Sequence, residues 1–541
     1  MQPIASRSDA DGGALLPAGH RAAPGKTSLL KRAGRWVRRM TFLLHRWIGI
    51  AIALLMAVWA VSGIVMMYVS FPETTSSERL AGLPDLEMGE CCSSGYLEAL
   101  EDGAVEGASV EMLVDRPVLR WSGPDGPQVI DLTTGETPVI DAIHAGRIAS
   151  SHYREATGAA AGLAVETIDR DQWTVYGRFR QHRPLYKASF GDVAGTVLYV
   201  SGLTGEVVQD TTAHERFWNW LGAVPHWLHF TAFREIQWLW YDFVVYTSVL
   251  GTFLTVTGIY IGLRQYGRGK TRSPYRGAAL WHHWTGLAFG IFTVTWVVSG
   301  LFSMQPWGWF ESEGPEAEHM ALAGRPATSQ DVAGLVRALT AQPAGDTVRA
   351  ELTVQGGAPF AILADAHSGL GRASLPSLAP SPPGESELAR RAQLARPADP
   401  IADMTMITRE DAYHYAHKQD VILPAWRVIY SDEEQTRLYF DPRTAEAIRK
   451  VDAEARAYRW LHYGLHRLDF PGLRTRPVWD IITLPLMLGV SLLCLTGCWM
   501  GWRRLTRTKK RRKTAVPDLP AAAPAGTMRW RISKNWRTRH C

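Results

Sequence analysis

Histidine, whose neutral imidazole is a common metal ligand, recurs in this sequence at matched positions of a long repeat. His45 begins the pattern H-x-W-x-G, which is followed after nine residues by W-x-V-S-G, and His282 begins the same two patterns with the same spacing. A second repeat aligns residues 198–230 with 438–470 without gaps and matches His226 to His466. Histidine is costly inside a bilayer and usually faces a partner, a cavity or a metal. Two histidines at equivalent positions of a repeat therefore predict two ligands that face one shared object.

Three further histidines lie close to these four and are alternative ligands. His283 follows His282 directly, His229 lies three residues after His226, and His462 lies four residues before His466. Residues three or four apart share one face of a helix, so either member of such a pair could be the ligand. The candidate ligands are thus His45, His282, His226 and His466, with His283, His229 and His462 as alternates.

Four apolar segments must position these histidines. The mean hydropathy of the 541-residue chain is only −0.10, but each of the four segments has about the 20 residues that cross a hydrocarbon core. We predict membrane helices over residues 42–70, 238–263, 278–304 and 477–502. The polar first 30 residues and the length of the first helix indicate a signal anchor rather than a cleaved signal peptide.

Basic residues flank these segments on one side. Eight Lys and Arg residues lie in 1–41, five in 264–277 and thirteen in 503–541, whereas the loops 71–237 and 305–476 are acidic on balance. Because positive charge stays on the cytoplasmic side, we predict that both termini are cytoplasmic and both long loops are outside. The net charge of +6 is then a topological signal, and no nucleic-acid partner is expected.

The two long loops show strand patterns. A strand that ends in D-x-x-T-G-E or a related turn occurs four times, twice in each loop. Helices are expected around 139–150, 329–341 and 408–418, and residues 368–400 are expected to be a linker rich in Pro, Ser and Ala. Each loop is predicted to be a small α+β unit built by duplication. The fold class is therefore an α+β integral membrane protein with four transmembrane helices in two duplicated halves.

The five cysteines predict no disulfide framework. Cys91 and Cys92 are adjacent in the first loop, Cys494 and Cys498 lie one turn apart on the last apolar segment, and Cys541 ends the sequence. The pair on the last segment could be redox-active or bind a metal, but small apolar packing is the commoner role of cysteine in a helix.

The four candidate histidines form two pairs. His45 and His282, the first pair, lie at the predicted cytoplasmic ends of two helices, and His226 and His466, the second pair, lie at the outer face. Two imidazoles on facing helices are the ligands that a six-coordinate haem iron accepts, which predicts two haems of b type, with their iron held by these histidines. Zinc is disfavoured because no compact H-x-x-x-H and carboxylate set lies on a membrane helix.

Two glycines follow the first pair by one turn. Gly49 lies four residues after His45, and Gly286 lies four residues after His282. They would leave room for a porphyrin beside the histidines, or they would allow two helices to approach closely.

These features resemble the PepSY-associated transmembrane family of bacterial inner-membrane proteins, over about residues 40–505. The resemblance is carried by L-H-R-W-x-G and H-H-W-x-G, by the D-x-x-T-G-E turns, by L-H-R at 465–467 and by T-G-x-x-x-G-x-R at 257–264 and 496–503. The chain departs from the family in its longer outer loops and in Ala445, which replaces the glycine of the fourth turn. Members include iron-regulated membrane proteins, siderophore-iron reductases and flavin-fused reductases.

The resemblance implies the following organisation in a bacterial inner membrane. Two PepSY-like domains, each with its histidine-bearing segment, would be periplasmic, and the two termini and the basic loop between the second and third membrane helices would be cytoplasmic. In chain order, the segments are a basic N-terminus 1–41, helix 42–70, periplasmic domain 71–237, helix 238–263, basic loop 264–277, helix 278–304, periplasmic domain 305–476, helix 477–502 and basic tail 503–541.

We therefore predict a di-haem electron-transfer protein that reduces an extracytoplasmic acceptor, with siderophore-bound ferric iron as the favoured one. The chain has no dinucleotide-binding motif, P-loop or flavin-type domain, so a quinol or a separate cytoplasmic reductase would be the donor. The alternative is a non-enzymatic protein whose PepSY domains bind or regulate a protease or another envelope partner. A transporter is a third class, for which four helices make a thin pathway unless a homodimer supplies more.

Overall fold

The computed structural model describes residues 26–89, 91–92, 105–123, 126–269, 271–416 and 421–506. Residues 26–30 are described by their backbone alone. The basic N-terminus up to residue 25, most of the basic tail and Cys541 lie outside the described residues. Within them, four helices are long and apolar enough to cross a membrane. These helices are α1 (Lys26–Met66), α8 (Gln237–Gln265), α9 (Ala278–Phe302) and α15 (Val478–Thr506).

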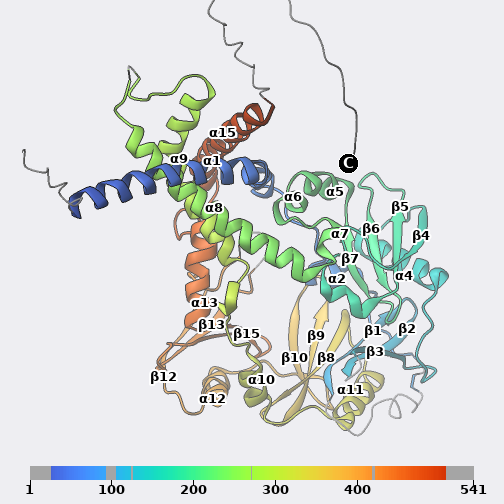
Figure 1. The fold of residues 1–541 in the computed structure, drawn as a ribbon. Coiled ribbons are helices and arrows are strands. Elements are labelled where there is room, and N and C mark those ends of the chain that lie inside the picture. The colour runs from blue at the N-terminus through green and yellow to red at the C-terminus, as the bar shows by residue number, and fades with distance from the viewer. Residues whose placement is uncertain are drawn as a thin grey trace, which may run out of the picture.

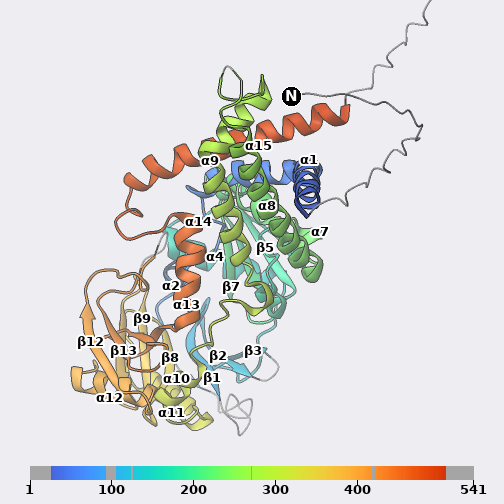
Figure 2. The same cartoon turned by 60° about the vertical axis from the view of Figure 1, so that its left-hand side comes forward.

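The four long helices pack as a closed ring in the order α1, α15, α9, α8. In this ring α1 and α9 are diagonal neighbours across the bundle, as are α8 and α15. The strands gather on one side of the bundle, and the α8–α9 connection lies on the other (Figures 1 and 2). We call these the domain side and the loop side. Helix α1 begins well before residue 42, because the basic segment ahead of the apolar run contains good helix formers and continues the helix.

Two four-stranded antiparallel sheets repeat one another in the two halves of the chain. The first has the order β4-β5-β6-β7 and the second the order β12-β13-β14-β15. One long helix packs on each sheet, and apolar side chains of the two layers form a core in each unit. The first unit contains α4 (Ala142–Thr157), β4 (Leu163–Ile168), β5 (Leu185–Phe190), β6 (Val197–Ser201) and β7 (Val207–Thr211). The second contains α12 (Glu385–Ala395), β12 (Ile401–Ile407), β13 (Ala425–Tyr430), β14 (Arg437–Phe440) and β15 (Ala447–Val451).

The remaining strands form one seven-stranded sheet to which both loops contribute, with the order β11-β10-β9-β8-β1-β2-β3. The expectation that each loop is a separate unit is therefore wrong, because β1 of the first loop pairs with β8 of the second. Helix α11 (Ser329–Ala341) covers this sheet with an apolar face. The strands are β1 (Glu106–Leu113), β2 (Arg116–Gly123), β3 (Gly126–Asp131), β8 (Thr347–Gln355), β9 (Ala358–Asp365), β10 (Leu370–Ser374) and β11 (Ala379–Pro380).

The β1–β8 register shows how the two halves are related. Val110 pairs with Ala350, Ser109 with Glu351, and Glu111 with Arg349. Val110 and Ala350 occupy the same position in the two repeats, at the offset of 240 residues that relates 198–230 to 438–470. A residue that pairs with its own counterpart must lie on the axis that relates the two halves. The molecule therefore has a pseudo-two-fold axis through this strand pair.

Short helices complete the two halves. The segment before α8 contains α5 (Ala213–Leu221), α6 (Ala223–Trp227) and α7 (Thr231–Arg234). The equivalent segment before α15 contains α13 (Ala453–Tyr458), the π-helical turn η3 (Arg459–Gly464) and α14 (Leu465–Arg467). The other short helices are α2 (Ser76–Ala81), η1 (Gly177–His182), η2 (Pro306–Gly308) and α10 (Glu316–Ala323).

Several local expectations are corrected. Residues 368–400 are not a plain linker, because β10, β11 and α12 lie within them. Residues 408–416 do not form a helix, and 417–418 lie outside the described residues. Cys91 and Cys92 are joined as a disulfide between adjacent residues, where none was expected, while Cys494 and Cys498 are free.

The fourth turn keeps its shape although alanine replaces glycine. The N–H of Gly205 donates to the carbonyl of Ser201 at 2.9 Å, and the N–H of Ala445 donates to the carbonyl of Asp441 at 2.8 Å. Gly205 has a φ of 68° and Ala445 a φ of 61°. Ala445 is buried, and its carbonyl accepts a hydrogen bond from Arg391. These tertiary contacts hold an alanine in the left-handed region, which normally favours glycine.

Candidate functional site: two facing histidine pairs

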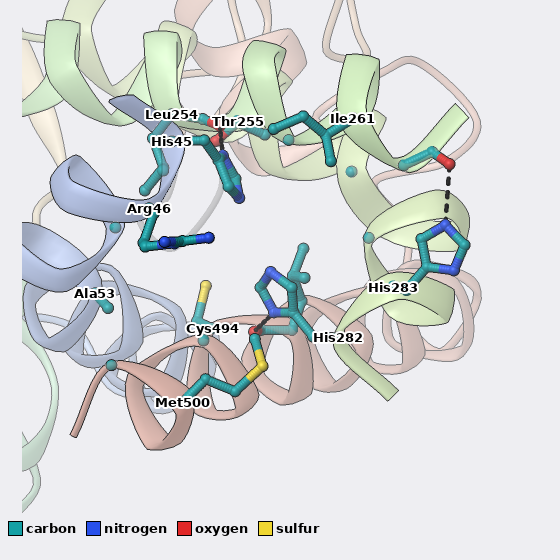
Figure 3. A pocket seen from close by; sticks show the side chains of 18 of the residues that line it. His45, Arg46, Ala53, Leu254, Thr255, Ile261, His282, His283, Cys494 and Met500 are labelled. Carbon is teal, nitrogen blue, oxygen red and sulfur yellow. Dashed lines mark hydrogen bonds between the residues drawn. The ribbon is translucent and has the colours of Figure 1, made fainter. Parts of the chain in front are cut away.

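The first pair faces across the bundle near its loop side. His45 comes from α1 and His282 from α9, the two diagonal helices, and the centres of their rings lie 6.5 Å apart at an interplanar angle of 51°. Figure 3 shows the two rings directed toward each other across a cavity. The structure thus brings together two residues that are 237 positions apart in the sequence.

Each histidine of the first pair is held by the helix beside it. Nδ1 of His45 lies 3.0 Å from the carbonyl oxygen of Leu254 and 3.4 Å from the hydroxyl of Thr257. Nδ1 of His282 lies 3.2 Å from the carbonyl oxygen of Leu493 and 3.3 Å from the hydroxyl of Thr496. Because a carbonyl only accepts, Nδ1 must carry the proton, which leaves the lone pair on Nε2. A neutral ring held in this way has its proton on Nδ1 and a free acceptor nitrogen at Nε2.

A glycine lies against each of these rings. A Cβ atom on Gly258 would lie 2.8 Å from Cε1 of His45, and one on Gly497 would lie 3.2 Å from Cε1 of His282. The repeated Thr-Gly of α8 and α15 is thus a seat for histidine, in which the threonine and a nearby carbonyl accept the proton of Nδ1 while the glycine gives room to the ring.

The second pair repeats this arrangement on the domain side. His226 of α6 and His466 of α14 have ring centres 6.2 Å apart. Nδ1 of His226 lies 3.1 Å from the carbonyl oxygen of Trp59 and 3.1 Å from the hydroxyl of Ser62. Nδ1 of His466 makes the equivalent contacts with Trp296 and Ser299, both at 3.1 Å. Here the repeated Ser-Gly of W-x-V-S-G is the seat, on α1 and α9.

In the second pair, too, a glycine lies against each ring, and burial lowers the pKa of each histidine. A Cβ atom on Gly63 would lie 3.5 Å from Cε1 of His226, and one on Gly300 would lie 3.3 Å from Cε1 of His466. Burial lowers the pKa of His226 to about 4, although its hydrogen bond to Trp59 opposes the shift. Burial, followed by the nearby His462, His226 and Arg467, lowers the pKa of His466 well below 6.5. Both rings are therefore neutral at physiological pH.

The two pairs lie at opposite ends of the bundle. Along α1, Trp59, which holds His226, lies roughly 20 Å beyond His45 at about 1.5 Å per residue. Each pair takes one histidine from each half of the chain, and the two members of a pair are held by equivalent residues, Leu254 and Leu493 in the first pair and Trp59 and Trp296 in the second. The pseudo-two-fold axis therefore relates the two members of both pairs.

The three alternate histidines have other surroundings. Both ring nitrogens of His283 are occupied, Nδ1 by the hydroxyl of Ser273 and Nε2 by the carbonyl of Gly262, each at 2.9 Å, and the ring lies to one side of the first pair (Figure 3). His462 stacks on His466 with ring centres 5.3 Å apart, and its Nδ1 lies 2.9 Å from the carbonyl of Ser299.

His229 is packed within an aromatic cluster rather than opposite another histidine. Its neighbours are Phe71, Tyr176, Trp227 and Trp240. Its Nδ1 is buried and has no hydrogen-bond partner among the described residues. Burial and the nearby Arg234 lower the pKa of His229 to about 3. This histidine is therefore a neutral core residue of the domain side.

The first pair lines a cavity of about 480 Å³, a volume within the usual range for small-molecule and cofactor sites. Its wall is mostly apolar and contains many glycines, including Gly49 and Gly286. A Cβ atom on either glycine would meet only a leucine side chain, at 3.4 Å and 3.6 Å, and no helix backbone. Of the two roles open for these glycines, the structure thus favours giving room to a ligand over close helix contact.

Sequence reasoning missed the residues that hold the histidines. The signal was present, because Thr-Gly and Ser-Gly recur at matched positions of the two halves. It could not be interpreted before the helix order was known, since each histidine is held by a helix other than its own.

Fold and site together define a four-helix α+β membrane protein with one facing histidine pair at each end of its bundle. A family model described as PepSY-associated TM region matches residues 112–504. The chain therefore belongs to this family, which confirms the resemblance and the fold class expected from the sequence. No curated protein matches the chain.

Proposed function

We propose that this protein is a di-haem b-type electron-transfer protein of the bacterial inner membrane that reduces an extracytoplasmic acceptor, with siderophore-bound ferric iron as the acceptor class. One observation carries the proposal. In each of two pairs, both Nδ1 atoms are bonded to backbone carbonyls, which leaves both Nε2 atoms free as ligands, and the two rings face each other at 6.5 Å and 6.2 Å.

The distances within the pairs would suit two imidazoles that hold one metal ion between them. With a metal–nitrogen bond of about 2 Å and about 1 Å from a ring nitrogen to the ring centre, the centres of two such imidazoles would lie up to roughly 6 Å apart. The observed separations are 6.5 Å and 6.2 Å. A tetrahedral zinc ion would hold the two ring centres about 5 Å apart and would need two more ligands. The pairs therefore suit a haem iron better than zinc.

The chain's own residues would then have definite tasks. His45, His282, His226 and His466 would hold the two haems, which supply one-electron transfer when bound. The carbonyls and hydroxyls at Nδ1 fix the tautomer and orientation of each ring, and hydrogen bonds of this kind make the ligand more basic. The mostly apolar wall of the cavity would contact the porphyrin of the first haem.

The direction of transfer follows from the positions of charge and of the sheets. Arginines crowd the loop-side ends of the described helices, and this positive charge supports a cytoplasmic position for that side. A quinol or a cytoplasmic reductase would donate electrons near the first pair. The second pair lies next to the PepSY domains, where a bulky ferric complex could dock without crossing the membrane.

The test is the absorption spectrum and haem content of the purified protein. We expect a low-spin b-type spectrum and two haems per chain, and we expect that His45→Ala or His282→Ala lowers haem content by about half. His283→Ala is the matched control, because its ring nitrogens are bonded within the protein; it should retain both haems. A protein that takes up no haem when haem is supplied in excess would contradict the proposal and favour a partner-binding role for the PepSY domains.

Transfer to the outside is tested in sealed vesicles. Reduced protein should be reoxidised by a ferric siderophore that is added to the domain side only, and His226→Ala or His466→Ala should block this reoxidation while the first haem still reduces. Reoxidation at full rate in both variants would reject the outward path.

A further inference from the structure

Arg46 directs an unpaired positive charge into the cavity of the first pair. It follows His45 on α1 and lines the cavity, and Figure 3 shows its guanidinium beside the space between His45 and His282. Its side chain has no hydrogen bond or ion pair with any described residue. Arg46 is exposed, so its permanent charge lies at the rim of the cavity, where it can pair with an anionic group of a ligand without the cost of full burial.

The cavity contains a second cation and no internal counter-charge. Arg504 of α15 also lines it and likewise has no ion pair within the described part of the chain. Among the described residues that line the cavity, none is an aspartate or a glutamate. Arg504 is exposed like Arg46, so both arginines lie at the rim with no carboxylate beside them in the described lining, and both are available to the carboxylates of a ligand.

The positive charge is confined to one side of the cavity. Helices α1 and α15, which carry Arg46 and Arg504, pack directly against each other. The counterpart of Arg46 in the other half is His283, whose nitrogens are occupied by Ser273 and Gly262. Figure 3 shows Arg46 and His283 on opposite sides of the histidine pair. The two halves thus carry equivalent histidines in the first pair but differ at the edge of the cavity, where one half has Arg46 and the other has His283.

We infer that Arg46 and Arg504 bind the carboxylates of the ligand of the first pair, and so orient its anionic edge toward α1 and α15. The inference rests on the proposed function, in which the ligand is haem and the carboxylates are its two propionates. Guanidinium and carboxylate form charge-assisted, often bidentate hydrogen bonds. Arg46 and Arg504 are therefore positioning residues, and the haem enters this site in one orientation.

The test compares haem with its dimethyl ester, in which both carboxylates are masked. The full chain carrying His226→Ala, in which binding reports on the first pair, is titrated with each porphyrin and followed by absorbance. Haem should bind roughly 10- to 100-fold more tightly than the ester, as expected for charged hydrogen bonds. With Arg46→Gln and Arg504→Gln added, this ratio should fall to within about twofold of one, whereas Arg46→Lys should retain part of it.

Arg503→Gln is the matched control, because it removes the same charge from the neighbouring residue, which does not line the cavity; it should leave the ratio unchanged. The inference is overturned if the ratio is near one in the parent chain, or if it persists in the double variant. In both of these cases a low-spin spectrum would still support the proposed function. No low-spin spectrum with either porphyrin would overturn the proposed function and this inference together.

Discussion

At the scale of single residues, a glycine limits the space for the ring of each histidine in the two pairs. The tightest fit to a histidine in either pair is that of Gly258, where an added Cβ would approach His45 to 2.8 Å. A side chain added at this glycine would displace the histidine ring from its hydrogen bonds. Loss of the contacts that orient a metal-binding histidine typically weakens metal binding by about 10- to 100-fold.

We therefore expect that Gly258→Ala lowers haem affinity at the first pair by at least roughly tenfold, with a smaller effect of Gly497→Ala, where the approach is 3.2 Å. The measurement is a haem titration of the purified variants. Gly34→Ala on α1 is the control, because an added Cβ there meets nothing within 4 Å. Equal haem affinity in Gly258→Ala and Gly34→Ala would show that the glycine seat is not needed.

A second residue makes the stability of the sheet domains depend on pH. Burial and the neighbouring Glu351 and Asp441 raise the pKa of Glu446 to about 7, from an ordinary value of 4.5. The folded protein therefore holds this proton more tightly than the unfolded chain does, so stability falls as pH rises from about 4.5 to about 7. We expect a loss of about 2–3 kcal/mol over this range. Glu446→Gln should remove it, as measured by thermal unfolding at pH 5 and pH 8; an unchanged pH dependence in this variant would contradict the assignment.

At the scale of elements, the histidines of the second pair are carried by two very short helices. Leu228 directly follows α6 and Leu468 directly follows α14, and both leucines have a left-handed backbone, with φ of 53° and 52°. They are counterparts in the two halves. A non-glycine residue in this conformation is uncommon, so the same turn in both halves indicates that it sets the direction of each histidine-bearing helix.

This turn can be tested with two substitutions at one position. Leu468→Gly should keep the haem of the second pair, because glycine adopts a positive φ without strain. Leu468→Pro should lose that haem and retain the one of the first pair, because proline fixes φ near −65°. The absorption spectrum and haem content of both variants give the answer. Retention of both haems in the proline variant would show that the turn does not position His466.

At the scale of the whole molecule, neither half of the chain can complete a site alone. Each histidine pair takes one member from each half, and the seven-stranded sheet joins the halves through β1 and β8. We expect that residues 1–269 and 271–541, expressed as two chains in one cell, copurify and bind two haems, whereas either chain alone binds none with a bis-histidine spectrum. A bis-histidine spectrum from either half alone would show that a histidine pair does not need one member from each half.

The sequence predicted the four membrane helices, the fold class and the repeated histidines, because apolar length and exact spacing are local properties of the chain. It did not predict the shared sheet, since the pairing of β1 with β8 joins segments far apart and leaves no mark in either strand alone. The seats of the histidines were missed for the same reason, because Thr257 and Ser62 act on rings that come from other helices. The role of Arg46 became visible only when its side chain was seen in a cavity without a carboxylate.

The pairing of Val110 with Ala350 on the pseudo-two-fold axis also bears on evolution. In a half-length ancestor, the residue at this position would have paired with itself in a second copy, and every histidine pair would have joined two identical subunits. Such an ancestor could only have worked as a homodimer with two symmetric sites. Fusion of the two copies into one gene freed each half to mutate separately, and Arg46 and His283, which now differ at one ancestral position, are a product of that freedom.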